Sequence, residues 1–193
     1  MIRDYLQAAR LRTLPLASAC VLTGGALAGA TGNVGFVRFI PLFTGCLVTV
    51  FLLQVLVNFA NDLGDFENGA DRAEGNERAD RAVASGRITA AQMKRAVLVT
   101  AGLAFATGVA TVLLAVGDAW MALLKWVGTG LASIAAAYAY TAGKRPYGYS
   151  GLGDISVLVF FGIAGVAGTA ALITGGFDPC LLYTSDAADE KVR

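Results

Sequence analysis

A dense group of side-chain oxygens follows directly on an apolar stretch of the chain. The segment NFANDLGDFENGAD, residues 58–71, comes straight after LFTGCLVTVFLLQVLV. On a helix Asn61 and Asp65 are one turn apart and share a face. Asp62 lies beside them, and Asp71 follows after a glycine. Oxygen donors of this kind suit a hard cation such as Mg²⁺, which typically takes one or two carboxylates and completes its shell with water and phosphate oxygens.

Three other interpretations compete with a metal site. A solvated loop would explain the charged run EGNERADR, but it would not explain acids at the end of an apolar helix, where buried carboxylates cost free energy. A calcium-binding EF-hand loop is excluded, because its glycine would fall on Ala70 when counted from Asp65, and a ligand position would fall on Gly64 when counted from Asp62. A cation-conducting or transport site stays open on chemistry alone.

The composition is that of a membrane protein. Of the 193 residues, 56% are hydrophobic and only 15% are charged, whereas soluble domains carry about a quarter charged residues. The chain contains no histidine, which excludes histidine-based acid–base catalysis, Ser-His-Asp triads and histidine-ligated zinc. The net charge of +1 gives no electrostatic case for nucleic acid as a partner. The partner implied instead is the lipid bilayer.

The apolar segments predict an all-α, polytopic bundle of transmembrane helices. A membrane span needs about 20 mostly apolar residues. Five segments qualify or nearly qualify, and they are about Leu14–Ala30, Phe39–Phe59, Ala96–Val116, Trp120–Ala142 and Leu152–Ile173. Before them, Ile2, Leu6 and Ala9 share one helical face, which predicts a short helix on the membrane surface.

Basic residues are distributed unevenly between the two sides of such a bundle. They gather before the first span, between the second and third spans, and between the fourth and fifth spans. These three regions lie on the same side of the membrane when the chain crosses it five times. The positive-inside rule places the N-terminus and these charged loops in the cytoplasm. The acidic segment is therefore predicted to lie at the cytoplasmic face of the membrane.

Cations and aromatic residues accompany the acidic segment on that face. Arg81 and Arg87 surround a Ser-Gly turn, and Lys144 and Arg145 occur among three tyrosines. Lysine, arginine and tyrosine are ordinary anchors at a membrane interface. Together with an acidic metal site, however, they would form a diphosphate pocket in which metal bridges and cations clamp the phosphates.

The motifs resemble those of a known enzyme family. NDLGDFENGAD resembles the first aspartate-rich motif, N-D-x-x-D and a later Asp, of the UbiA superfamily of intramembrane aromatic prenyltransferases. RTLPLA, GRITAAQMKRA and YTAGKRPYGYSGLGDISVLVFFG are similar to the branch that prenylates 1,4-dihydroxy-2-naphthoate for menaquinone biosynthesis. The resemblance runs from Arg10 to about Gly168. Within it, GYSGLGDISVLVFFG argues against the 4-hydroxybenzoate branch.

The resemblance implies nine transmembrane helices around a cavity and two aspartate-rich motifs that hold Mg²⁺ on a polyprenyl diphosphate. A role in menaquinone biosynthesis also implies a location in the inner (plasma) membrane. Departure of diphosphate leaves an allylic cation, which the naphthoate ring attacks with loss of CO₂. Asn61 and Asp65 would be metal ligands and catalytic residues, and Asp62 and Asp71 would be further ligands or supports. The residues implied to contact diphosphate or acceptor are Arg10, Arg12, Arg81, Tyr140, Lys144, Arg145 and Tyr149. A small cation-coupled transporter is the alternative from another class.

The C-terminal part departs from the family pattern. No second N-D-x-x-D occurs before Pro179, and Asp154 is isolated. The last residues, CLLYTSDAADEKVR, neither continue a span nor cap a helix, and CLLYTSDAADE corresponds to a translated transposase-type sequencing adapter. We therefore expect residues 1–179 to be the N-terminal portion of a prenyltransferase domain with five of nine spans, and residues 180–193 to be a non-native tail. We expect the chain as written to be inactive.

Overall fold

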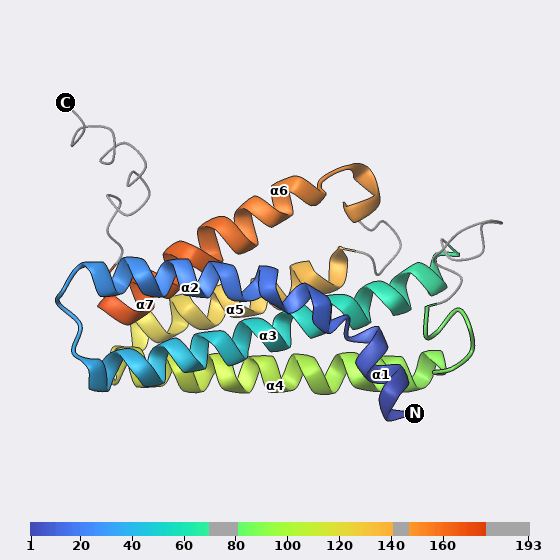
Figure 1. Cartoon of the computed structure of the whole chain (residues 1–193), viewed down its shortest axis with the longest axis horizontal. Helices are drawn as coiled ribbons and strands as arrows, with labels where there is room; N and C mark the ends of the chain where they lie inside the picture. Colours follow the sequence, from blue (N-terminus) through green and yellow to red (C-terminus); the bar gives the residue numbers. More distant parts are fainter. Residues whose placement is uncertain (70–80, 141–146, 177–193) are drawn as a thin grey trace.

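The computed structural model describes residues 1–69, 81–140 and 147–176 (Figure 1). Every regular element in these ranges is helical, and five helices are long and apolar enough to cross a membrane. The elements are α1 (Ile2–Ala8), a 3₁₀ turn (Leu11–Thr13), α2 (Leu14–Ala30), α3 (Phe36–Glu67), α4 (Ala90–Val116), α5 (Trp120–Ala139), a 3₁₀ turn (Tyr147–Ser150), α6 (Gly153–Val157), a π-helical segment (Leu158–Ala167) and α7 (Gly168–Thr174). The prediction of an all-α integral membrane protein with five spans is confirmed.

Helix α3 is longer than the apolar pattern predicts. It continues beyond Phe59 through the acidic segment to Glu67, and the chain then turns at Gly69, whose φ is +73°. No proline or left-handed residue interrupts residues 42–67, so the helical hydrogen bonds continue into the polar segment. The acidic side chains therefore project from the end of a long helix and not from a loop.

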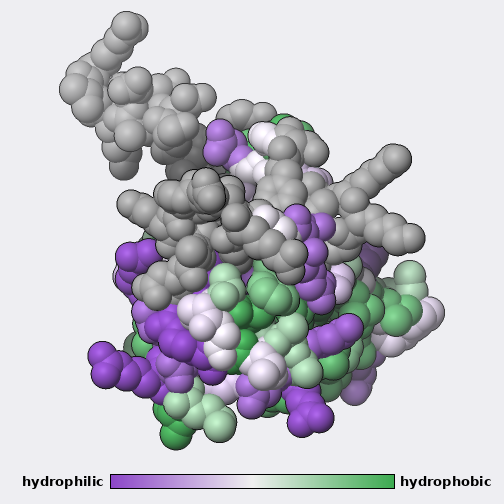
Figure 2. All heavy atoms as spheres, turned by 90° about the vertical axis from the view of Figure 1, so that its right-hand side faces the viewer, coloured by the Kyte–Doolittle hydropathy of each residue, from purple (hydrophilic) through white to green (hydrophobic). Residues whose placement is uncertain are grey.

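The long helices lie side by side along the molecule (Figure 1). Helix α3 packs most extensively on α4, and α2 packs on α3, α7 and the π-helical segment. Helix α1 lies at the end of the bundle where α3 finishes (Figure 1). Ala8 and Ala9 are buried there, whereas Ile2 and Leu6 are exposed, so Ala9 packs inside the bundle and does not share the exposed face that the sequence predicted for these three residues. Hydrophilic side chains are prominent at this end of the molecule (Figure 2).

Close backbone contact joins α2 to the fifth span. A Cβ added to Gly24 would lie 2.5 Å from the Val166 carbonyl oxygen, and one added to Gly165 would lie 2.9 Å from Cys20 Sγ. Only glycine permits this separation, which is the usual way for membrane helices to gain packing energy. The contact fixes the π-helical segment against α2, and the segment in turn forms one wall of the cavity described below.

At the opposite end of the bundle, one arginine connects three helices. Arg38, in the first turn of α3, donates from Nε to the Ile173 carbonyl at 3.2 Å and from Nη2 to the Ala115 carbonyl at 2.9 Å. Both carbonyls belong to the last turns of their helices, α7 and α4, where carbonyl groups lack helical partners and the helix dipole is negative. Arg38 therefore caps two helices at once.

We expect Arg38→Ala to lower the free energy of unfolding by about 1 kcal/mol, because two charge-assisted hydrogen bonds at a partly exposed site are lost. Thermal unfolding of the protein in detergent micelles measures this as a fall of a few degrees in the midpoint. Arg38→Lys keeps the charge and is expected to recover part of the loss. An unchanged midpoint in Arg38→Ala would contradict the capping role.

Candidate functional site

The acidic end of α3 brings together three of the predicted site residues. Asn61 and Asp65 lie one turn apart on the helix, and the Asp65 side chain is only 4% exposed. Arg81 forms an ion pair with Asp65 through Nη1 and Oδ2, and the same nitrogen donates to the Asn61 backbone carbonyl at 3.3 Å. The arginine returns to α3 from beyond the segment 70–80, which lies outside the described residues. An anionic and a cationic group are thus held against each other at the end of an apolar helix.

Asp62 has different partners. It is 2% exposed, and its Oδ1 and Oδ2 accept the backbone N–H groups of Val83 and Ala82 at 3.2 and 3.3 Å. Neighbouring residues on a helix point about 100° apart, so Asp62 faces the returning chain while Asn61 and Asp65 share another face. The carboxylate anchors the turn that carries Arg81, and it thereby sets the position of that guanidinium beside Asp65.

The anchored turn rests on a hydrophobic cluster directly beneath the polar end. Ala82, Val83 and Ile88 are buried there with side chains from α1, α3 and α4. Further members of the cluster are Ala8, Ala9, Leu56, Phe59, Leu63, Met93 and Val97. Burial of this apolar surface stabilises the turn against α3. The position of Arg81 therefore depends on both a hydrogen-bonded anchor and a packed core.

A second polar layer lies one and two turns further down α3. Asn58 Nδ2 donates to the Ala9 carbonyl at 2.8 Å and to Thr13 Oγ1 at 3.0 Å, and Gln54 Nε2 donates to the same Thr13 Oγ1 at 3.1 Å. These contacts attach the start of the chain to α3. Sequence reasoning did not identify Gln54 or Thr13 as site residues. The available signal was a single glutamine inside an apolar span, where an uncharged polar group still costs free energy unless it is paired.

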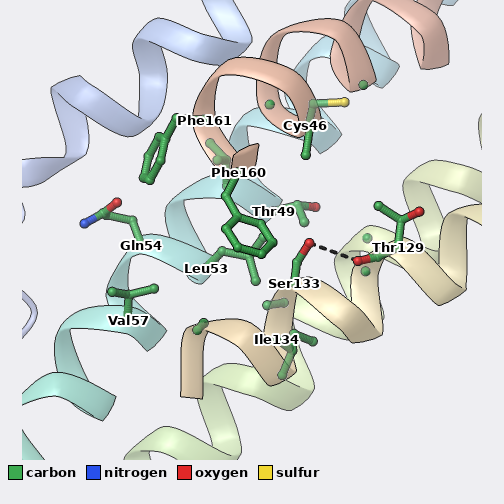
Figure 3. Close-up of a pocket in the computed structure, with 18 of the residues that line it drawn as sticks. Cys46, Thr49, Leu53, Gln54, Val57, Thr129, Ser133, Ile134, Phe160 and Phe161 are labelled. Carbon is green, nitrogen blue, oxygen red and sulfur yellow. Dashed lines mark hydrogen bonds between the residues drawn. The ribbon is translucent and has the colours of Figure 1, made fainter. Parts of the chain in front are cut away.

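A cavity of about 430 Å³ extends from this polar end into the apolar interior. It is lined by residues of α2, α3, α4, α5 and the fifth span, Gly153–Thr174. On α3 its lining runs from Cys46 to Asn61, about 22 Å at 1.5 Å per residue. Figure 3 shows Leu53, Val57, Ile134, Phe160 and Phe161 around it. The walls are mainly apolar, and their polar groups include Thr49, Gln54, Asn58, Asn61, Thr129, Ser133, Tyr140 and Tyr147.

Two of the tyrosines stand together in the cavity wall. The rings of Tyr140 and Tyr147 meet edge to face with centroids 5.3 Å apart, and Tyr147 donates its hydroxyl to the Ala136 carbonyl at 3.0 Å. The Tyr140 carbonyl also accepts the Gly148 N–H at 2.9 Å. Tyr147 and Gly148 therefore lie beside the end of α5. Of the tyrosines in the predicted site, Tyr140 lines the cavity.

The remaining predicted residues are placed as follows. Arg10 is half-buried and has a positive φ of 49°, at the break between α1 and the 3₁₀ turn, and Arg12 is exposed. Arg87 donates to Gln7 Oε1 and Ser85 Oγ, each at 2.9 Å, and so holds α1 to the turn. The predicted site residues and segments that lie outside the described part are Asp71, Lys144, Arg145, the side chain of Tyr149 and residues 180–193.

The site can bind a ligand that is polar at one end and apolar along the rest. At the polar end, Asn61 and Asp65 offer amide and carboxylate oxygens. Among the described residues, no three His, Cys, Asp or Glu side chains are grouped so that they could hold a metal ion by themselves. Arg81 offers several N–H donors in a planar fork, which matches phosphate and carboxylate groups. Below them the cavity offers mainly hydrocarbon. Such an arrangement suits an anionic lipid-like molecule entering from the bilayer.

Comparisons with known proteins agree with this description. The model of the UbiA prenyltransferase family matches residues 17–185. The 1,4-dihydroxy-2-naphthoate octaprenyltransferases of Haemophilus influenzae and Escherichia coli are each 41% identical, over 92% and 95% of this chain and 56% and 58% of their own lengths. The enzyme of the same name from Mycobacterium tuberculosis is 34% identical over 86% of this chain and 52% of its own length.

The chain thus spans about half the length of these curated relatives. No solved structure showed significant similarity to it. The family match covers four of the five spans completely, together with the N-D-x-x-D segment at the end of α3 and the cavity beneath it. On this evidence, the chain belongs to the UbiA prenyltransferase family.

Proposed function

We propose that this protein transfers a polyprenyl group from a polyprenyl diphosphate to 1,4-dihydroxy-2-naphthoate, with loss of CO₂, as a step of menaquinone biosynthesis. Mg²⁺ is its proposed cofactor. The names of the relatives support the choice of acceptor. The observation that carries the proposal is the shape of the site. A mainly hydrocarbon cavity along α3 ends at Asn61, beside the Asp65–Arg81 pair.

That geometry corresponds to the two halves of a prenyl diphosphate. The tail is as apolar as the lipid around it, so its transfer into the cavity needs little desolvation. The head is a multiply charged anion, and it would meet the cationic Arg81 and a bound cation at the polar end. A soluble enzyme would have to extract the tail from the membrane, whereas a cavity between membrane helices is already in contact with it.

The residues present fit a magnesium ion. Mg²⁺ is usually held by one or two protein carboxylates and completes its shell with water and phosphate oxygens. Asn61 and Asp65 supply oxygen donors on adjacent turns, without a nitrogen or sulfur ligand beside them to favour a softer metal. We propose that these two residues hold the ion, with Asp71 as a further ligand, and that Asp62 supports them by anchoring the turn of Arg81. When bound, the ion neutralises charge on the departing diphosphate.

The residues of this chain then have separate tasks in the proposed reaction. The bond between the allylic carbon and the diphosphate oxygen breaks, and its electron pair leaves with the diphosphate, whose oxygens Arg81 contacts. The ring carbon that bears the carboxylate forms the new bond to the allylic carbon. The carboxylate leaves as CO₂, and the electrons of that bond return to the ring. Apolar walls such as Leu53 and Phe160 exclude water, which would otherwise capture the cation.

Further residues complete the proposed site by the resemblance of their motifs. They are Arg10, Arg12, Tyr140, Lys144, Arg145 and Tyr149, as contacts of diphosphate or acceptor. We further propose that the acidic end of α3 and the N-terminus face the cytoplasm, in accord with the positive-inside distribution of basic residues. Both diphosphate and the naphthoate would then be exchanged with the cytoplasm.

A direct assay tests the function. The complete gene product, in membrane vesicles, is given a series of prenyl diphosphates with 1,4-dihydroxy-2-naphthoate labelled at the carboxyl group. We expect Mg²⁺-dependent release of labelled CO₂ in equal amount to diphosphate, and no release after chelation of the metal. 4-Hydroxybenzoate serves as the competing acceptor. A preference for 4-hydroxybenzoate would move the protein to another branch of the family. Movement of a solute across sealed vesicles without release of diphosphate would contradict the enzyme.

A further inference from the structure

One polar atom in the cavity wall lacks a partner. Gln54 lies in the middle of the α3 face that lines the cavity and is 8% exposed. Its Nε2 is bonded to Thr13, but its Oε1 has no hydrogen-bond partner among the described residues, and it is the one buried side-chain N or O atom there of which this is true. An unpaired buried acceptor costs about 1–3 kcal/mol, so such an atom usually serves a purpose.

The hydrogen-bond network determines which end of the Gln54 amide is unpaired. Thr13 Oγ1 has one hydrogen, which it donates to the Arg10 carbonyl at 2.9 Å. Towards Gln54 and Asn58 it can therefore only accept, and it does so from both NH₂ groups, at 3.1 and 3.0 Å. Turning the amide over would place an oxygen against an oxygen. The Gln54 NH₂ group must face Thr13, and the carbonyl oxygen must be the group left for a ligand.

The chemistry of the proposed reactants selects the ligand. A prenyl tail has no hydrogen-bond donor, and the diphosphate offers mainly acceptor oxygens, which an amide oxygen would repel. The hydroxyl groups of a dihydroxyarene are the donors available in the reaction. We infer that Gln54 Oε1 accepts a hydrogen bond from a hydroxyl group of the aromatic acceptor, and that Thr13 positions it. This inference rests on the proposed function. It places the aromatic substrate at the level of Gln54 in the cavity.

The depth is consistent with that assignment. Gln54 is seven residues, or about 10 Å along the axis, below Asn61 and on nearly the same face of α3. An aromatic acceptor bound there would lie beneath the diphosphate, next to the first carbons of the prenyl chain. Figure 3 shows Phe160 and Phe161 as further aromatic side chains of the same cavity, and such rings offer a surface on which a flat naphthalene can stack.

Steady-state kinetics of the complete gene product in vesicles test the inference. We expect Gln54→Leu to raise the KM for 1,4-dihydroxy-2-naphthoate about tenfold, the usual effect of one lost hydrogen bond to a substrate. The KM for prenyl diphosphate and the Mg²⁺ requirement are expected to stay within twofold. Thr13→Val is expected to act in the same direction and Thr13→Ser to restore the wild-type value, because only the hydroxyl orients the amide. Asn33→Leu, which also replaces a side-chain amide by leucine but at an exposed position between α2 and α3, is the matched control.

Two naphthoates that each lack one of the two hydroxyl groups show which group is recognised. Their inhibition constants are measured with wild type and with Gln54→Leu. The analogue that keeps the recognised hydroxyl is expected to bind Gln54→Leu about tenfold more weakly than it binds wild type. The analogue that lacks this hydroxyl is expected to bind both proteins equally. The unfolding midpoint of Gln54→Leu is expected to change little, since the substitution removes an unpaired acceptor together with the single hydrogen bond from Nε2 to Thr13.

The outcomes separate this inference from the function on which it rests. If wild type does not prenylate 1,4-dihydroxy-2-naphthoate, both are wrong. If wild type turns over but Gln54→Leu leaves the acceptor KM unchanged, the function stands and the inference is overturned, and Oε1 then binds only water. Equal weakening of both analogues would also overturn it, because the effect would come from the shape of the cavity and not from one hydroxyl.

Discussion

Asp65→Ala is expected to lower prenyl transfer by at least about a thousandfold while leaving the protein inserted in the membrane. The substitution removes a proposed metal ligand and also releases the guanidinium of Arg81 from its buried partner. Both changes weaken stabilisation of the charge that develops on diphosphate, and loss of a single such interaction commonly costs a hundredfold to a thousandfold. The assay is release of labelled CO₂ from the carboxyl-labelled acceptor in vesicles with equal amounts of inserted protein.

Glu67→Ala is the matched control for this prediction. Glu67 is an acidic residue in the last turn of the same helix, but it is exposed and outside the proposed site. Its substitution is expected to leave turnover within twofold. Asp65→Asn adds a second comparison, since it keeps the shape of the side chain and one oxygen but loses the charge. Near-normal turnover of Asp65→Ala at low Mg²⁺ would show that this carboxylate does not hold the metal.

The second large effect concerns stability. Asp62→Ala is expected to lower the free energy of unfolding by about 3 kcal/mol. The substitution removes the buried carboxylate and leaves the backbone N–H groups of Ala82 and Val83 without their acceptor. Activity should fall as well, since Arg81 is held beside Asp65 by the same turn. Thermal unfolding in detergent measures the first effect, and the rate of proteolysis within residues 81–88 reports the loosened turn directly.

A conservative variant distinguishes a structural role of Asp62 from a role as a metal ligand. Asp62→Asn retains an acceptor oxygen and is expected to recover part of the lost stability, with an unchanged Mg²⁺ requirement. Asp118→Ala, at an exposed acid between α4 and α5, should alter neither stability nor activity. A strongly raised Mg²⁺ requirement in Asp62→Asn, with a normal unfolding midpoint, would instead make Asp62 a metal ligand.

The number of spans and the polar segment that accompanies them were predictable from the sequence. Helix α2 begins at Leu14 and ends at Ala30, as its apolar run indicates, and the other four spans were found with ends shifted by up to eight residues. Membrane insertion depends on the hydrophobicity of consecutive residues, which is a local property of the chain. The chemical character of the acidic segment is equally local, because it follows from the residue types alone.

Residue pairs far apart in the chain were not predictable in this way. The contact of Gln54 with Thr13 joins positions 41 residues apart, and the bond from Asp62 to the Val83 N–H joins positions 21 apart. Spacing along one helix shows which side chains share a face, but not which segment packs against that face. The same limit applies to the π-helical segment, Leu158–Ala167. Its apolar sequence does not show whether a membrane span is α-helical or π-helical.

The sequence by itself determined that this chain has five segments able to span a membrane and carries an oxygen-rich, histidine-free polar segment at the end of the second. The tertiary structure decided how the members of that segment divide their roles. Asp65 is directed to Arg81, and Asp62 to the backbone of the returning turn. Outside that segment, Gln54 in the cavity wall donates to Thr13 and keeps one buried oxygen without a partner among the described residues. The physical reason is that hydrophobicity and ligand type belong to single residues, whereas the partner of a buried polar group is set by whatever the packing of distant segments places beside it.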